Sequence, residues 1–463
     1  MATDDLITDT IAAVSTPPGR GGIGIVRLSG PKAAVIAAQL VRLRQPLEHA
    51  RARLADVLDE ADTGVDAGRI DEAVVTFFAA PRSYTAEDLV EIAAHGSPVV
   101  LELLLGRALA LGARLAEPGE FTQRAFLAGR LDLTQAEAVR DLIDAQTLTQ
   151  ARQAASQMGG ALSRRVRPVK QALVELIALL EAGIDFAEDD VDVTPAAEIT
   201  RRIGELTPPL LALEASFARG RLVHDGLTLA IVGRPNAGKS SLFNCLVKRD
   251  RAIVTATPGT TRDTVTERIS LEGIPLELVD TAGLREASEE VEQLGIARSR
   301  EAMADAALVV VVLDATERLN DEERKLLTAV EGRPAVVAVN KSDLLGTLTE
   351  SGWLPQECNG IPALATSALT GEGITALRER IVALATGGAA AEPGMLTSLR
   401  HQQAITATLA ALSDAAQANA ANIPHEMILL DLYRGLASLD SLTGQTTPDD
   451  ILNLIFSTFC IGK

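Results

Sequence analysis

The residues best suited to chemistry lie near the middle of the chain, in the stretch LTLAIVGRPNAGKSSLFNCLV that begins at Leu227. An apolar run typical of a buried strand leads into a glycine-bounded loop, and an amphipathic helical pattern follows. The loop has the spacing G-x-x-x-x-G-K-S, in which glycines let backbone N–H groups wrap phosphate oxygens. Lys239 would offer a positive charge to the outer phosphates, and the Ser240 hydroxyl would ligate Mg²⁺. The residues predicted to line this part of the site are Asn236, Ala237, Gly238, Lys239, Ser240 and Ser241.

Two segments downstream supply what a metal ion and a γ-phosphate would need. TPGTTRDTV, at residues 257–265, offers Thr260 and Thr261, one of which would reach the metal once a γ-phosphate is present. PLELVDTAG ends a predicted buried strand in Asp280, the usual place for the carboxylate behind Mg²⁺. Gly283 then permits the loop to approach the γ-phosphate. The pattern predicts a nucleotide switch.

The choice of base is indicated by AVVAVNKSD, which ends another predicted strand. Asp343 can accept hydrogen bonds from the ring N–H and the amino group of guanine together, which adenine cannot match. Asn340 and Lys341 precede it, and ALATSA supplies Ser367 and Ala368 after a fifth predicted strand. In order and separation the five segments resemble the G-box set of TRAFAC GTPases, so the predicted base is guanine.

One position departs from that pattern. Leu284 follows D-T-A-G, where Ras-like switches carry a water-orienting glutamine, and a leucine side chain cannot hold a water molecule. Hydrolysis therefore needs another polar group. The acidic candidates in the next segment, REASEEVEQLG, are Glu286, Glu289, Glu290 and Glu292. The alternative for each is the solvated face of a surface helix.

The chain of 463 residues is too long for one hydrophobic core, and its length favours about three domains. Residues 131–222 and 396–458 share helical spacing of Ala, Leu, Gln and Glu, with few β-branched runs. We expect both arms to pack into one bundle, with a nucleotide domain inserted between them, because the termini of a domain often lie close together. Such a bundle would bring the last residues of the chain beside the N-terminal domain.

Composition limits the classes of function. The net charge of −19 argues against broad, nonspecific wrapping of nucleic acid, so any RNA contact must be local or shared with a partner. The acidic start MATDDLITDT is unlike a signal peptide, and no apolar run approaches the length of a membrane span. We expect a cytoplasmic protein without a membrane anchor. The cysteines, Cys245, Cys358 and Cys460, form no metal or disulfide pattern.

The chain ends in FCIGK, and Cys460 has three possible roles. As a lipidation box the segment is poor, because Gly462 is not aliphatic and Lys463 is not a customary last residue. A cysteine is also a common core filler. The third role is a nucleophile, whose thiolate would need partial access and a nearby cation such as Lys463.

The N-terminal part contains GRGGIG at residues 19–24, which matches a dinucleotide-binding spacing. The next residues predict a strand, so no helix would receive a pyrophosphate, and a glycine-rich hairpin is favoured. Glu91 lies in another predicted strand, where it either faces solvent or meets a specific pair of donors. His95 is predicted in a turn, before a helix capped by Ser97 with Pro98 in its first turn.

With these residues in place, the whole chain resembles the MnmE (TrmE) family of tRNA-uridine-modification GTPases. The resemblance runs from STPPGRGGIGIVRLSG through EPGEFTQRAFLAGRLDLTQAEAV and the G boxes to the terminal FCIGK. It implies a multidomain α/β plus all-α protein: an N-terminal α+β folate-binding and dimerisation domain, a discontinuous helical bundle and an inserted Ras-like α/β G domain. The implied divisions are residues 1–125, 126–225 with 387–463, and 226–386 respectively.

The resemblance also implies a reduced folate, 5,10-methylene-tetrahydrofolate or 5-formyl-tetrahydrofolate as an analogue. By motif match, Arg27, Glu91, Arg130 and Lys463 would line its site, although other members carry lysine at the position of Arg130. A carboxylate suits the amino group and ring N–H of a pterin, and cations suit the glutamyl tail. Cys460 would lie near the folate carbon and is a candidate catalytic residue.

For hydrolysis, the resemblance implies activation by K⁺, which would neutralise charge between the phosphates as an arginine finger does. Glu292 would orient the attacking water through a second water. Arg262 and Asp263 would lie in a loop that orders when two G domains meet. The implied ligands are Asn236, Thr255, Thr257 and Thr260 for K⁺, and Ser240 and Thr261 for Mg²⁺.

The implied reaction adds an aminomethyl or carboxymethylaminomethyl group to C5 of the wobble uridine of certain tRNAs. The implied partners are a second copy of the chain, the tRNA and the FAD-dependent protein MnmG (GidA). RRVRPVK, at residues 164–170, is either a local RNA contact or a solvated helix face. Two other functions share the G boxes: a ribosome-assembly GTPase without modification chemistry, and a folate-binding regulatory GTPase.

Overall fold

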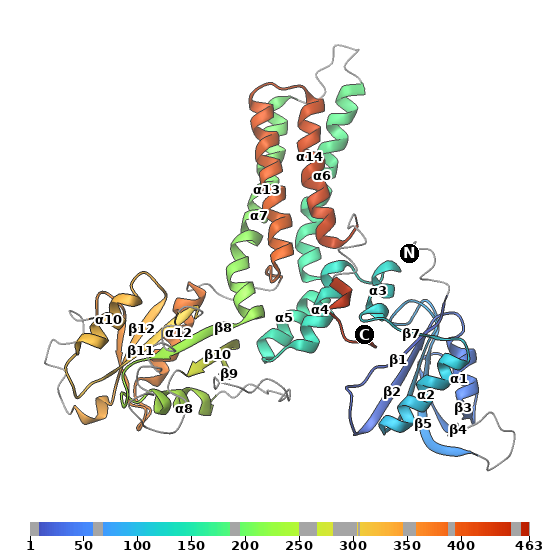
Figure 1. Cartoon of the computed structure of the whole chain (residues 1–463). Coiled ribbons are helices and arrows are strands. Elements are labelled where there is room, and N and C mark those ends of the chain that lie inside the picture. Colours follow the sequence, from blue (N-terminus) through green and yellow to red (C-terminus); the bar gives the residue numbers. More distant parts are fainter. Residues whose placement is uncertain are drawn as a thin grey trace. The chain divides into compact units, whose positions relative to one another are not determined.

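The structure is a computed structural model that describes residues 9–58, 68–185, 195–249, 266–280, 303, 306–345, 358–387, 394–445 and 455–462. Figure 1 shows the helices and strands of the chain, which divides into two compact units. The first unit joins Met1–Arg140 to Met158–Gly160 and Asp440–Lys463, and the second comprises Asp141–Gln157 and Ala161–Leu439.

The first unit is built on a seven-stranded sheet in the order β3-β4-β5-β6-β2-β1-β7. Neighbouring strands are antiparallel except for the parallel pair β1–β7. Helices α1 (Ala33–Leu40) and α2 (Pro98–Ala110) pack on one face, where alternate strand residues form a buried core. The strands are β1 (Ile11–Val14), β2 (Gly21–Ser29), β3 (Val41–Leu43), β4 (Arg51–Leu58), β5 (Arg69–Phe78), β6 (Leu89–Gly96) and β7 (Arg114–Leu115).

Local predictions for this unit are mostly confirmed. The last four residues of GRGGIG already lie in β2, so no helix follows the glycines. Helix α2 has Ser97 at its N-cap and Pro98 in its first turn, although the Ser97 side chain makes no capping hydrogen bond. The prediction for His95 is wrong: it lies in β6, because that strand continues to pair with β2 as far as Gly96 opposite Gly21.

The end of the chain packs on the first unit. Phe456 and Phe459 form a buried cluster with Leu133 and Ala136 of α4 (Leu133–Asp144). Ile461 pairs with Pro118, directly before α3 (Glu120–Leu127). The expectation that the tail lies beside the N-terminal domain is confirmed.

The second unit contains a helical bundle drawn from both arms of the sequence. The side chain of Glu214 accepts a hydrogen bond from Thr406 at 2.6 Å, and Asn419 donates to the backbone oxygen of Ala196 at 2.8 Å. A Cβ at Gly220 would lie 2.0 Å from the carbonyl oxygen of Leu396, so the two arms approach at backbone distance. The predicted bundle is therefore confirmed. Its helices are α5 (Leu148–Met158), α6 (Ala161–Asp185), α7 (Ala196–Asp225), α13 (Leu399–Ala420) and α14 (His425–Thr443).

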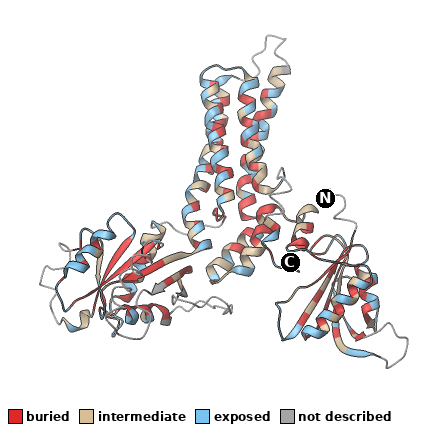
Figure 2. Cartoon of the chain, viewed as in Figure 1, coloured by how far each residue is buried: buried red, intermediate tan, exposed pale blue. Residues whose placement is uncertain are grey.

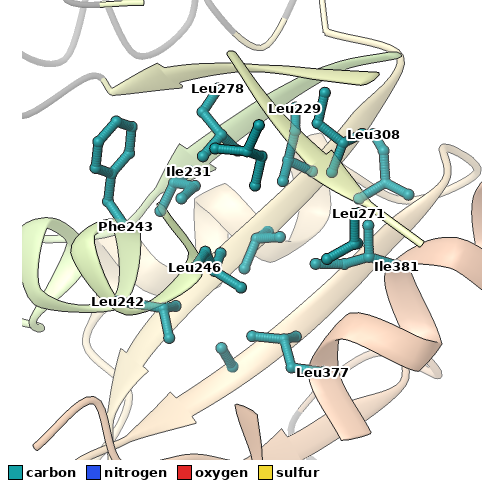
Figure 3. Packing of buried hydrophobic residues seen from close by; sticks show 14 of the residues in the cluster. Leu229, Ile231, Leu242, Phe243, Leu246, Leu271, Leu278, Leu308, Leu377 and Ile381 are labelled. Carbon is teal, nitrogen blue, oxygen red and sulfur yellow. The ribbon is translucent and has the colours of Figure 1, made fainter. Parts of the chain in front are cut away.

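Between α7 and α13 the chain forms a six-stranded sheet in the order β13-β12-β11-β8-β10-β9, parallel except for β9–β10. Apolar clusters cover both faces, which explains why its central strands are apolar runs (Figure 2). Figure 3 shows one cluster, in which Leu242 and Leu246 of α8 face strand residues such as Ile231. The elements are β8 (Leu227–Val232), α8 (Lys239–Arg249), β9 (Thr266–Leu271), β10 (Ile274–Asp280), β11 (Leu308–Asp314), α10 (Asp321–Ala329), β12 (Ala335–Asn340), β13 (Ala363–Ala365) and α12 (Ile374–Thr386).

The predicted fold class is thus confirmed: an α+β part, a discontinuous helical bundle and an inserted Ras-like α/β domain. Among the described residues, none of the helices combines the length and apolar character needed to cross a bilayer.

Candidate functional site

The phosphate loop lies between β8 and α8, as the sequence predicts, and its two glycines are sterically required. Gly233 has φ 152°, and a Cβ there would lie 2.3 Å from the carbonyl oxygen of Val312. Gly238 has φ 93°, and a Cβ there would lie 2.1 Å from Nδ2 of Asn340. Any side chain at either position would push the loop away from the neighbouring strand ends.

Lys239 and Ser240 open α8, so the N-terminal end of this helix faces the loop. The Lys239 side chain is buried within the loop, and its Nζ donates to the backbone oxygen of Arg234 at 2.8 Å. Ala237 is buried, while Asn236, Ser240 and Ser241 are exposed. A cationic side chain and a helix N-terminus thus converge on one loop, an arrangement that suits phosphate.

Asn340 joins three of the predicted segments. It ends β12 with a buried side chain, whose Nδ2 donates to the backbone oxygen of Ala237 at 3.0 Å. The backbone N–H of Ala368 donates to its Oδ1 at 3.0 Å. Ser367, also predicted, is buried beside Ala368. The phosphate loop, the N-K-S-D turn and the S-A loop therefore form one structure around a single amide.

Lys341 and Asp343 follow Asn340 at the same sheet edge. Lys341 has φ 64°, and Asp343 lies in a short 3₁₀ helix, Ser342–Leu344. A positive φ is uncommon for a residue with a side chain and persists only where the surroundings hold it. Asp343 is half-buried, so its carboxylate remains available to a ligand.

Asp314, which none of the sequence motifs indicated, ends β11 opposite Asn340 of β12. Its carboxylate is buried and accepts a hydrogen bond from the ammonium of Lys341 at 2.6 Å. The signal was present, because the apolar run LVVVVLD ends in a carboxylate, as β10 does at Asp280.

Asn236 and Ser240 are described, but most of the other residues predicted for metal binding and hydrolysis lie outside the described residues. Asp280 ends β10 as predicted, but its side chain belongs to the same group. The predictions for them therefore remain predictions. Besides the Asp280 side chain, the predicted residues outside the described part of the chain are Thr255, Thr257, Thr260, Thr261, Arg262, Asp263, Gly283 and Glu292.

A second constellation lies in the first unit, around Arg27 of β2 and Glu91 of β6. The two residues are directly opposite in register. Arg27 donates from Nε at 3.0 Å and from Nη2 at 2.7 Å to the same oxygen, Oε1 of Glu91. Of the two alternatives for Glu91, the pair of donors is confirmed, and the side chain remains 26% exposed. Oε2 of Glu91 makes no hydrogen bond with any described residue.

The same arginine holds the chain's end. Arg27 Nη1 and the Ser15 hydroxyl each donate to the backbone oxygen of Gly462 at 3.1 Å. Gly462 has φ 92°, and a Cβ there would lie 2.6 Å from the carbonyl oxygen of Val14. Lys463 lies outside the described residues, but the residue before it is fixed beside Arg27.

Two aromatic rings that no sequence motif indicated complete this constellation. The Arg27 guanidinium carbon lies 5.9 Å from the ring centroid of Tyr84 and 5.5 Å from that of Phe121. That of Arg130 lies 5.3 Å from the Tyr84 ring, and Arg130 Nη1 donates to the Tyr84 carbonyl at 2.5 Å. Burial raises the pKa of the Tyr84 hydroxyl, which bonds Thr122 at 2.9 Å. Arg27 and Arg130 thus lie at the same ring, and Glu91 is joined to them through its pair with Arg27.

A buried charge network supports α3, which carries Phe121. Arg124 is almost fully buried and pairs with Asp9 at 2.6 Å, Glu120 at 2.9 Å and Glu87 at 3.1 Å. Burial raises the pKa of Glu120, but hydrogen bonds from Arg114 and Arg124 outweigh it and the net pKa is lowered. Removing one partner from such a network is costly, because the remaining charges stay buried.

Cys460 is exposed, so the expectation that it fills a core is wrong. Phe456 and Phe459 occupy the apolar cluster instead, and the backbone oxygen of Cys460 accepts from the Gly119 N–H at 3.4 Å. Cys358 is buried and Cys245 is partly buried against a core cluster, so these two match that role. A catalytic role for Cys460 remains a prediction.

RRVRPVK lies on α6, with Arg164 and Arg167 exposed and Arg165 and Lys170 half-buried. It forms a helix face as expected, and an RNA contact there remains a prediction.

Comparisons with known proteins agree with this picture. A family profile described as the "GTP-binding protein TrmE N-terminus" matches residues 10–130, and one described as the "MnmE helical domain" matches residues 133–460. A protein of Koribacter versatilis named "tRNA modification GTPase MnmE" is 57% identical over 99% of this chain and 100% of its own length. A protein of the same name from Heliobacterium modesticaldum is 44% identical over 99% of this chain and 100% of its own length.

Among solved structures, the G domain of the FeoB iron transporter of T. maritima is 32% identical, covering 34% of this chain and 98% of that one, with a TM-score of 0.26. The identity to the full-length relatives, over nearly every residue of both proteins, decides the assignment. The chain belongs to the MnmE family of tRNA modification GTPases.

Proposed function

We propose that this protein hydrolyses GTP to drive the addition of an aminomethyl or carboxymethylaminomethyl group to C5 of the wobble uridine of certain tRNAs. The observation that carries the proposal is the fixation of the chain's last residues, including exposed Cys460, beside the Arg27–Glu91 pair in a member of this family. A terminus held by side-chain hydrogen bonds next to charged groups is what a reaction site requires and what a disordered tail lacks.

GTP is supported by the fit of the described residues. The phosphate loop presents a lysine and a helix N-terminus. Asn340 fixes the distance between this loop and the turn that carries Asp343. Mg²⁺ would be held by Ser240 with Thr261, and K⁺ by Asn236 with Thr255, Thr257 and Thr260. Asn236 has φ 64° and is exposed at the loop, which leaves its side chain accessible to a cation.

A reduced folate, 5,10-methylene-tetrahydrofolate, fits the second constellation. Glu91 has one carboxylate oxygen without a partner among the described residues, suited to the amino group of a pterin. Tyr84 and Phe121 offer ring surface, and Arg130 offers a cation for the glutamyl tail. Lys463 would add a second cation. The folate would supply one carbon, and Cys460 would lie close enough to act on it.

A homodimer formed through the N-terminal domain is supported by the sheet face opposite α1 and α2. Leu54 and Val74, directly opposite in register on β4 and β5, are each more than 40% exposed, and Ile23 of β2 is 67% exposed. Apolar side chains grouped on an open sheet face favour association. We further propose a cytoplasmic location and the domain divisions 1–125, 126–225 with 387–463, and 226–386.

An FAD-dependent protein of the MnmG (GidA) type would supply the redox chemistry that none of the described constellations provides. The acidic balance of this chain, −19, favours a division of labour in which the partner contributes most of the basic surface for tRNA.

The experiment is mass spectrometry of wobble nucleosides from cells that lack this protein and from the same cells supplied with it. We expect C5-modified uridine to disappear without the protein and return with it. C5-modified uridine that persists unchanged in cells without the protein would refute the proposal. A ribosome-assembly GTPase would instead change ribosomal particles and leave the wobble nucleosides intact.

A further inference from the structure

The buried carboxylate of Asp314 lies beside side chains from two loops of the nucleotide site. Its side chain is 4% exposed. Oδ2 lies 2.6 Å from Nζ of Lys341, in the base-recognition turn, and 3.9 Å from Nη2 of Arg234, in the phosphate loop. Oδ1 accepts from the Thr316 backbone N–H at 2.9 Å and from its hydroxyl at 2.6 Å. Both oxygens are therefore occupied, and the carboxylate cannot rotate without breaking one set of bonds.

Lys341 needs such an anchor for two reasons. Its backbone has φ 64°, a conformation that costs free energy in a residue with a Cβ. Its four-carbon stem is flexible, and ordering it costs conformational entropy. Because Lys341 caps the 3₁₀ helix that carries Asp343, a lysine that leaves this position would release the turn that holds the guanine-binding carboxylate.

Arg234 is held differently, because Asp314 is only its most distant partner. It pairs with Glu317 at 2.5 Å and with Glu323 at 3.3 Å. Glu323 is itself fixed in the capping box of α10 with Asn320. The phosphate loop would therefore keep two anchors if Asp314 lost its charge, whereas Lys341 has no other ion pair among the described residues.

Hydrogen bonding accounts for the charge on Asp314. Burial raises the pKa of this carboxyl, but hydrogen bonds from Lys341 and Thr316 outweigh that effect, and the net pKa is lowered. The group is thus ionised at neutral pH, as an anchor for an ammonium requires.

We propose that Asp314 is a positioning residue for the guanine nucleotide: by holding the Lys341 ammonium, it keeps the Lys341–Asp343 turn in the conformation that accepts the base. This inference rests on the proposed binding of GTP. It assigns no contact between Asp314 and the nucleotide, so the effect of Asp314 must pass through Lys341. Because the turn faces the base and not the γ-phosphate, Asp314 should support GDP and GTP binding equally.

The test is a double-mutant cycle of Asp314→Asn and Lys341→Met in the full-length protein, read by equilibrium binding of fluorescent GDP and a non-hydrolysable GTP analogue. We expect Asp314→Asn to weaken both nucleotides about tenfold, the usual scale for a lost charge-assisted hydrogen bond. KM for GTP should rise to match, while kcat at saturating GTP stays within about twofold. In the Lys341→Met background, Asp314→Asn should add nothing.

Glu322→Gln is the matched control, because it neutralises an exposed carboxylate of α10 that has no ion pair with Lys341 or Arg234 among the described residues. We expect its affinities to match the wild type. Asp314→Glu restores the charge at a displaced position and should recover part of the affinity.

Two results would overturn the inference. The first is that the losses of affinity caused by Asp314→Asn and Lys341→Met multiply in the double mutant. The second is that Asp314→Asn alone binds both nucleotides within twofold of the wild type. If Asp314→Asn does not fold by circular dichroism, Lys341→Met alone decides, because unchanged affinity there removes any need to position the lysine. Wild-type protein that binds neither nucleotide would refute GTP binding itself, which is a different result.

Discussion

Arg27 and Glu91 stand opposite each other on adjacent antiparallel strands, and Arg27 binds one oxygen of the Glu91 carboxylate through two nitrogens. The third nitrogen of the guanidinium holds the backbone oxygen of Gly462. One side chain thus orients a carboxylate and also holds the chain's C-terminal segment, at a residue 435 positions after Arg27 in the sequence. The strand register fixes this geometry, so the carboxylate keeps its orientation before any ligand arrives.

The first prediction concerns that carboxylate. Glu91→Gln keeps the shape of the side chain but removes the charge that would pair with a pterin, so binding of 5-formyl-tetrahydrofolate should weaken about tenfold or more. Isothermal titration calorimetry measures the change. Glu72→Gln on neighbouring β5 is the control, since its exposed pairs with Arg44 and Arg69 contribute little. Equal folate affinity in wild type and Glu91→Gln would remove Glu91 from the site.

The second prediction concerns the placement of the tail. In Gly462→Ala the new Cβ would lie 2.6 Å from the Val14 carbonyl oxygen, in a backbone with φ 92°. The tail should detach, and tRNA modification should fall at least about tenfold while GTP hydrolysis persists. Gly112→Ala is a matched control, because Gly112 has φ 97° with nothing within 4 Å of a Cβ. Comparable losses in both variants would point to backbone strain and not to placement of the tail.

The third prediction concerns Cys460, whose exposed side chain leaves the thiol accessible. Cys460→Ser should abolish modification and leave both GTP hydrolysis and folate binding intact, because the hydroxyl is a far weaker nucleophile at neutral pH. Wobble nucleosides from cells that carry only the variant provide the measurement. Full modification by Cys460→Ser would show that the thiol takes no part in the reaction. Cys245→Ser, which changes a partly buried cysteine of the G domain, controls for a general loss of stability.

The sequence predicts the nucleotide site well because parallel strands end at one sheet edge, so motifs at strand ends must meet there. Asn340 and Gly238, 102 residues apart, lie within contact distance for this reason. Asp314 could not be predicted because its contact with Lys341 depends on the register of β11 against β12. The sequence shows that a strand ends at Asp314, but it does not show which residue of the neighbouring strand lies opposite.

The constellation around Arg27 and Glu91 was less predictable from physical patterns. The contact of Arg27 with Glu91 depends on the register of β2 and β6, which no local pattern specifies. Tyr84 lies in a loop, and Phe121 lies on α3, a helix stabilised by buried ion pairs. For Cys460 the residue type is misleading. Cysteine is often buried, but Phe456 and Phe459 already fill the neighbouring apolar cluster.

The fourth prediction concerns hydrolysis. Leu284 cannot orient water, so turnover should depend on Glu292 and on K⁺. Glu292→Ala should bind GTP normally but lose turnover by about two orders of magnitude or more, and Na⁺ in place of K⁺ should slow the wild type. Single-turnover assays in the two salts test both effects. Equal rates in K⁺ and Na⁺ would eliminate the cation mechanism, and Glu289→Ala serves as a control for a neighbouring acid.

The fifth prediction concerns His224, near the C-terminal end of α7. Its Nε2 lies 3.2 Å from Asp141 and its Nδ1 lies 2.7 Å from Asp225. The hydrogen bond with Asp141 raises the pKa of His224 to about 9, against the opposing effect of burial. Because the pKa is higher in the folded than in the unfolded protein, the protonated histidine stabilises the fold.

That stabilisation should be fully present below about pH 6.5, the unfolded pKa, and lost as pH rises through about 9. Allowing for partial exposure, it should amount to about 2 kcal/mol at its largest. Thermal unfolding from pH 6 to pH 10 should therefore show a decline in wild type that His224→Gln lacks. His425→Gln, at a histidine with no ion pair among the described residues, should decline as the wild type does. Parallel curves for wild type and His224→Gln would mean that the charge on His224 adds nothing to stability, since a coupled protonation must make the two diverge.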